Sequence, residues 1–137
     1  MKTLMLISVL FMAGIQNVAA QINITVTWDK ELCNDTCFTQ QDCEYYVCFQ
    51  LWDNCGERPV LLCQDCKSVD CSMEEANFTC PDCENVSNEE CYTLVGAVQK
   101  RCIGLGGTIV TCTGTGHQDY SCPYLMEYGG TVETTWN

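Results

Sequence analysis

Basic residues are scarce in this chain. Its 137 residues include only six Lys and Arg against eighteen Asp and Glu, which gives a formal net charge of −12. Nucleic acids and anionic membrane surfaces are both recognised through patches of positive charge. We therefore expect neither a nucleic acid nor an anionic membrane as a partner.

Long hydrophobic runs are also lacking after the beginning of the chain. Lys2 precedes an apolar stretch over residues 4–15, and small residues follow at 18–20. The apolar stretch is shorter than the roughly 20 residues that span a bilayer, and the whole pattern is typical of a secretory signal peptide. We expect residues 1–20 to be such a peptide, the mature chain to begin at Gln21 without membrane insertion, and the protein to be secreted and extracellular.

Groups that could carry catalysis are few. The only histidine is His117, which excludes a ribonuclease that uses two histidines, and Ser121 near it builds no convincing triad. The carboxylate pairs at 74–75 and 89–90 are sequence neighbours, so they do not flank a bond as a glycosidase requires. The acidic residues form no EF-hand calcium loop. We expect no enzymatic activity, no cofactor and no metal.

Cysteine, in contrast, is abundant. All fourteen cysteines follow residue 32 and make up about 12% of the predicted mature chain, which is typical of a disulfide scaffold in an oxidising compartment. Their even number predicts up to seven bridges, with a connectivity that stays open. They are Cys33, Cys37, Cys43, Cys48, Cys55, Cys63, Cys66, Cys71, Cys80, Cys83, Cys91, Cys102, Cys112 and Cys122.

Two Cys-x-x-Cys pairs, at 63–66 and 80–83, have a spacing that approaches that of a zinc ribbon. Zinc requires thiolate ligands, and a disulfide sulfur is not one. The predicted secretory route and the ten further cysteines favour oxidation. We therefore expect these four cysteines to form disulfides.

Four sequons point to the same compartment, because Asn-x-Ser/Thr is the acceptor for N-linked glycans in secreted proteins. We expect glycosylation at Asn23, Asn34, Asn77 and Asn85.

The pattern of apolar residues favours strands. Residues 21–28 alternate apolar and polar side chains, which predicts a half-buried strand with Asn23 on the polar face. Residues 44–52 and 59–63 predict a hairpin, and residues 108–113 are expected to pair with 97–103. The fold class expected is a small, disulfide-rich, mainly β protein whose short strands and hairpins are stapled by up to seven disulfides.

The composition changes along the mature chain. Residues 21–90 are acidic, carry the sequons and are dense in cysteine, whereas residues 91–137 are nearly neutral and rich in Gly, Thr and Tyr. Within the first portion, residues 63–91 have few large apolar side chains, so we expect disulfides to hold their fold. The two portions are either two small modules or one continuous domain.

The nearly neutral portion carries a group of aromatic residues that suits an interface, because Tyr and Trp are frequent interface anchors. The candidate binding face is Tyr120, Tyr124, Tyr128 and Trp136. An alternative role for these rings is to cap a small core. The function expected is non-catalytic binding of an extracellular protein, as a ligand, decoy or inhibitor. The alternatives are a self-associating structural subunit of a coat, matrix or filament and, third, a small secreted hydrolase.

Overall fold

The computed structural model describes residues 20–29, 43–104 and 106–136. These residues form seven strands and one short helix, in agreement with the predicted mainly β, disulfide-rich class. The elements are β1 (Gln21–Trp28), β2 (Cys43–Asp53), β3 (Val60–Asp70), β4 (Glu75–Pro81), β5 (Tyr92–Gly104), β6 (Gly107–Tyr120), α2 (Cys122–Tyr128) and β7 (Gly130–Trp136).

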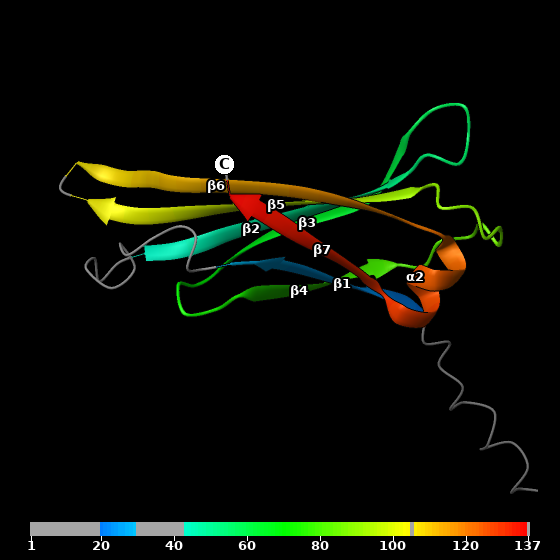
Figure 1. Ribbon diagram of the computed structural model, residues 1–137, viewed down its shortest axis with the longest axis horizontal. Helices are drawn as coiled ribbons and strands as arrows, with labels where there is room; N and C mark the ends of the chain where they lie inside the picture. Colours follow the sequence, from blue (N-terminus) through cyan, green and yellow to red (C-terminus); the bar gives the residue numbers. More distant parts are fainter. Residues whose placement is uncertain (1–19, 30–42, 105, 137) are drawn as a thin grey trace, which may run out of the picture.

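The described strands lie in one sheet with the order β3-β2-β5-β6-β7-β1-β4. Neighbouring strands are antiparallel except β1 and β7, which run parallel. The sheet curls into two layers, with β3, β2, β5 and β6 in one and β1 and β4 in the other, and β7 crosses between them (Figure 1). Strands from the acidic and the nearly neutral portions of the sequence therefore share a single sheet.

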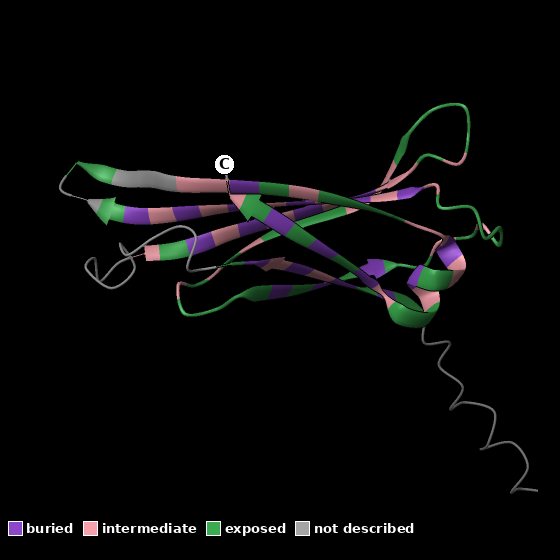
Figure 2. Cartoon of the chain, in the orientation of Figure 1, coloured by how far each residue is buried: buried purple, intermediate pink, exposed green. Residues whose placement is uncertain are grey.

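Strand β1 confirms the alternation seen in the sequence. Ile22, Ile24, Val26 and Trp28 are buried, whereas Asn23 is exposed. The two predicted hairpins are also present, as β2–β3 and β5–β6, although their strands are longer than the sequence indicated. The alternation of burial along β1, β2 and β5 is visible in Figure 2.

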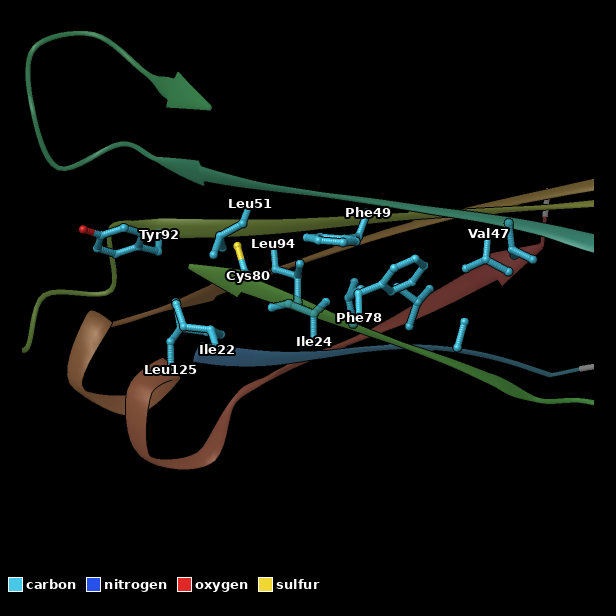
Figure 3. Close-up of a cluster of buried hydrophobic side chains, with 14 of the residues drawn as sticks. Ile22, Ile24, Val47, Phe49, Leu51, Phe78, Cys80, Tyr92, Leu94 and Leu125 are labelled. Carbon is cyan, nitrogen blue, oxygen red and sulfur yellow. The ribbon is translucent and has the colours of Figure 1, made fainter. Parts of the chain in front are cut away.

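The core lies between the two layers. Val47, Phe49 and Leu51 of β2 face it from one side, and the residues of β1 and β4 face it from the other (Figure 3). The rings of Phe49 and Phe78 meet across the layers with their centroids 4.8 Å apart.

Strand β4 shows that residues 63–91 contribute more to the core than we expected. Ala76, Phe78 and Cys80 alternate with exposed residues and are all buried. Only Phe78 has a large side chain among the three. Our count of large apolar side chains in residues 63–91 therefore did not reveal a short strand in which every second residue is buried. Burying Phe78 alone contributes roughly 2–3 kcal/mol.

Disulfides join these elements, and the described residues include no free cysteine. The five bridges seen are Cys43–Cys102, Cys48–Cys66, Cys55–Cys91, Cys63–Cys80 and Cys83–Cys122. Cys71 and Cys112 are also disulfide-bonded. Cys33 and Cys37, like most of the predicted signal peptide, lie outside the described residues.

Glycines allow β7 to cross close to β6 and β5. A Cβ atom on Gly116 would lie 2.0 Å from the backbone oxygen of Glu133, and one on Gly96 would lie 2.7 Å from Cγ1 of Val132. Real Cβ atoms do not approach other atoms so closely, so only glycine fits at Gly116 without movement of the β7 backbone. The glycine-rich composition of the C-terminal portion thus has a packing reason.

Candidate interaction surface

Helix α2 is held by its two caps and by its inner face. The Oγ atom of Ser121 accepts a hydrogen bond from the backbone N–H of Tyr124 at 3.3 Å, and Pro123 lies in the first turn. Gly129 ends the helix with a φ of 76°, a conformation that favours glycine. On the inner face, Leu125 is buried and Cys122 is bridged to Cys83.

At the junction of β6 and α2, three of the predicted binding residues form a row of rings on the outside of the molecule. We call this row the tyrosine ladder: Tyr120, Tyr124 and Tyr128. The centroids of Tyr120 and Tyr124 are 5.4 Å apart with the rings stacked, and those of Tyr124 and Tyr128 are 4.9 Å apart. Residues four apart are neighbours on a helix, which explains the contact between the last two rings. The side chains of Tyr124 and Tyr128 are 48% and 68% exposed.

The ladder is fixed at one end and charged at the other. The hydroxyl group of Tyr120 accepts a hydrogen bond from the backbone N–H of Thr131 at 2.9 Å and donates one to the oxygen of the same residue. At the exposed end, the neighbouring Glu127 carboxylate raises the pKa of Tyr128. Tyr128 thus stays a neutral hydrogen-bond donor at physiological pH.

Trp136, the fourth predicted binding residue, lies elsewhere. Its ring packs against Tyr45 with a centroid distance of 6.0 Å, and its Nε1 atom donates a hydrogen bond to the backbone oxygen of Asp29. Trp136 is the last of the seven residues of β7, so it lies roughly 20 Å from the helix at the usual rise per residue. Trp136 therefore extends the aromatic packing of Trp28 and Tyr45 rather than the tyrosine ladder.

Two of the predicted glycosylation sites face each other on β1 and β4. Asn23 pairs with Thr79 and Thr25 pairs with Asn77, so each asparagine opposes the threonine of the other sequon. The Oγ1 atom of Thr25 donates a hydrogen bond to Oδ1 of Asn77 at 2.9 Å. Both asparagines are exposed, as an acceptor for a glycan must be.

The other two sequons differ in their setting. Asn85 is half-buried, and its Oδ1 atom accepts a hydrogen bond from the backbone N–H of Ser87 at 2.9 Å. Asn34 lies outside the described residues.

Asn23 also lies beside the end of α2, which sequence order could not reveal. A Cβ atom on Gly129 would be 2.5 Å from the backbone oxygen of Asn23 and 3.5 Å from its Cβ. The side chain of Asn23 thus begins next to the residue that follows Tyr128. A glycan attached to Asn23 would lie beside the Tyr128 end of the tyrosine ladder. A partner would then contact the ladder from the end nearer Tyr120.

His117 and Ser121, the residues that the sequence offered for catalysis, have separate settings in the structure. His117 is exposed on β6, in a shallow depression shared with Thr115 and Glu133. The Ser121 hydroxyl caps α2. Within the described residues, no three His, Cys, Asp or Glu side chains are grouped so that they could hold a metal ion.

Two buried tyrosines contribute to the core rather than to the surface. Burial and, secondarily, the Glu74 carboxylate raise the pKa of Tyr45, and burial and the Asp53 carboxylate raise that of Tyr92. The hydroxyl group of Tyr92 donates a hydrogen bond to Asp53. These tyrosines show the core-capping role that we considered as an alternative for the C-terminal aromatic residues.

No family model, curated protein or solved structure matches the chain. The part of the chain that the structure describes contains no helix of the length and apolarity needed to cross a membrane. Its several disulfides are typical of extracellular proteins.

Proposed function

We propose that this chain is a secreted glycoprotein that binds another extracellular protein without catalysing a reaction, and that the tyrosine ladder is the centre of the contact. The observation that carries the proposal is the exposure of Tyr124 and Tyr128 in a row of stacked rings. A row of aromatic side chains left in water has a free-energy cost that contact with a partner removes.

The ladder is also pre-organised for binding. The hydrogen bonds of Tyr120 fix the first ring, and Leu125 and the Cys83–Cys122 bridge hold the helix that carries the others. Because these side chains are already ordered, binding costs less conformational entropy than it would on a mobile loop. The predicted signal peptide, the sequons and the disulfides support an extracellular partner.

The test is a binding screen with matched variants. The glycosylated chain, biotinylated and tetramerised, is applied to a panel of secreted proteins and cell-surface ectodomains. For a partner found in this way, Tyr124→Ala and Tyr128→Ala should each weaken binding by about 1–3 kcal/mol, measured by biolayer interferometry.

Met73→Ala is the matched control, because Met73 is 43% exposed and lies far from α2 in the sequence. It should leave the affinity unchanged. Full affinity in both tyrosine variants would show that the ladder is not the contact.

A further inference from the structure

The layer formed by β3, β2, β5 and β6 has a second face, which points away from the core and which we call the outer face. The strand register aligns its residues in rows across the strands. Three successive rows are Ser68–Tyr46–Gln99–Thr113, Cys66–Cys48–Ala97–Thr115 and Gln64–Gln50–Val95–His117. None of these twelve residues is Asp, Glu, Lys or Arg.

This lack of charge stands out in a chain with a net charge of −12. Acidic residues border the rows, with Glu44 beyond one end, Asp119 beyond the other and Glu133 of β7 at the side, next to His117. The exposed sequon asparagines Asn23 and Asn77 belong to the opposite layer. A second copy of the same acidic, glycosylated chain would therefore meet the least repulsion at the outer face.

The side chains of the outer face are ordered along the sheet. Trp52 donates a hydrogen bond from Nε1 to Oε1 of Gln50 at 3.1 Å, and Gln50 donates one to Gln64 at 3.2 Å. The guanidinium group of Arg101 lies 4.0 Å from the ring centroid of Tyr46 and donates to Gln99. These contacts reduce the ordering that an interface would require.

The register also places opposite charges symmetrically about Ala97. On β5, Arg101 lies four residues to one side of Ala97 and Thr93 four residues to the other. Asp119 is paired with Thr93 on the neighbouring strand, and its Oδ1 atom accepts a hydrogen bond from the Thr93 hydroxyl at 2.7 Å. A two-fold axis that crosses the strands at Ala97 brings Arg101 of each copy opposite Asp119 of the other.

We propose that the outer face is a self-association surface, through which two copies pack face to face about such an axis. The small side chain of Ala97 at the axis allows the two sheets to approach closely. Four strands over the nine residues 93–101 give a planar footprint of roughly 500 Å² per copy at the usual strand spacings. That is near the lower limit for a specific interface, so the dimer is expected to be reversible and concentration-dependent.

Sedimentation of the full glycosylated chain at about 1–100 μM tests the proposal, because weak specific dimers dissociate in this range. The wild type should shift from monomer to dimer with concentration. Arg101→Glu and Asp119→Arg should each weaken the dimer about tenfold or more, because each places like charges across the axis. The variant with both changes should recover most of the wild-type affinity, since the opposite charges meet again in exchanged positions.

Two further variants make the result specific to this surface. Ala97→Glu places two carboxylates at the axis and should abolish dimerisation, and an unchanged circular dichroism spectrum checks that it folds. Tyr124→Ala should leave the dimer intact, so failure of this proposal and failure of the tyrosine ladder are distinguishable. A wild type that stays monomeric at the highest concentration, or a double charge exchange that does not recover association, would overturn the proposal.

Discussion

Gly116 shows how much a single position without a side chain can determine. The backbone of β7 passes so close to it that a Cβ atom would overlap the backbone oxygen of Glu133. Backbone atoms in a paired strand cannot move aside as a flexible side chain would. Gly116 thus helps to set the place where the sheet passes from one layer to the other.

Gly116→Ala should therefore lower the free energy of unfolding by about 2–3 kcal/mol through overpacking against β7. Urea unfolding under non-reducing conditions measures the change. Gly56→Ala is the matched control, because a Cβ atom there would meet nothing within 4 Å. It should change the free energy of unfolding by less than about 0.5 kcal/mol, and equal effects of the two substitutions would contradict the assigned role of Gly116.

At the scale of elements, helix α2 holds the tyrosine ladder in place and depends on its caps. The side chain of Ser121 satisfies a backbone N–H group of the first turn that has no partner within the helix. Ser121→Ala should destabilise the helix by about 1 kcal/mol. The backbone N–H groups of Leu125 and Gly129, which donate hydrogen bonds to the backbone oxygens of Ser121 and Leu125, should then exchange about fivefold faster with deuterium.

Ser68→Ala is the control for this measurement, because Ser68 is an exposed serine of β3, far from α2 in the sequence. It should leave the exchange of Leu125 and Gly129 unchanged. Unchanged exchange in the Ser121 variant as well would show that packing of Leu125, rather than the cap, holds the helix.

Local elements were predictable from the sequence, whereas their long-range arrangement was not. The alternation over residues 21–28 predicted β1 and its buried face correctly, and the turn residues between apolar runs predicted both hairpins. No local pattern indicates that β1 lies between β7 and β4, because side-chain periodicity contains no information on strand order. We also missed α2, although Ser121, Pro123 and Gly129 are helix-capping signals.

The candidate site was predictable in part for the same reason. The spacing of four between Tyr124 and Tyr128 is the signal that joins them on one face of a helix, and the structure adds the ring of Tyr120 from the end of β6. Trp136 was grouped with them by sequence proximity, but an extended strand carries it away. The nearness of Asn23 to α2 depends on the β1–β7 pairing, so it required the structure.

At the scale of the whole molecule, one bridge closes the two layers against each other. Cys63–Cys80 joins β3 and β4, the two strands at the ends of the sheet order, whereas Cys48–Cys66 joins adjacent strands of one layer. The sequence separations are 17 and 18 residues. Loop-closure entropy therefore predicts the same contribution from both bridges, about 3 kcal/mol each.

Replacing either pair by alanine should thus cost similar global stability, but with different local effects. Cys63→Ala with Cys80→Ala should increase hydrogen exchange in β4, because its link to β3 is lost. Cys48→Ala with Cys66→Ala should leave β4 protected, because β2 and β3 remain paired. Equal exchange in β4 for both double variants would show that core packing alone keeps the layers together.

The position of β1 has a consequence for the time course of folding during synthesis. Its neighbours are β4 and β7, and Thr134 donates a hydrogen bond to the backbone oxygen of Thr27 across 107 positions of the chain. Strand β1 thus leaves the ribosome well before β7, and its hydrogen-bond ladder is incomplete until β7 has been synthesised. Contacts of such long range are formed slowly and leave strand edges open to aggregation in the meantime. Glycans attached to Asn23 and Asn77 during synthesis would keep the unpaired strand edges soluble until β7 is made and pairs with β1.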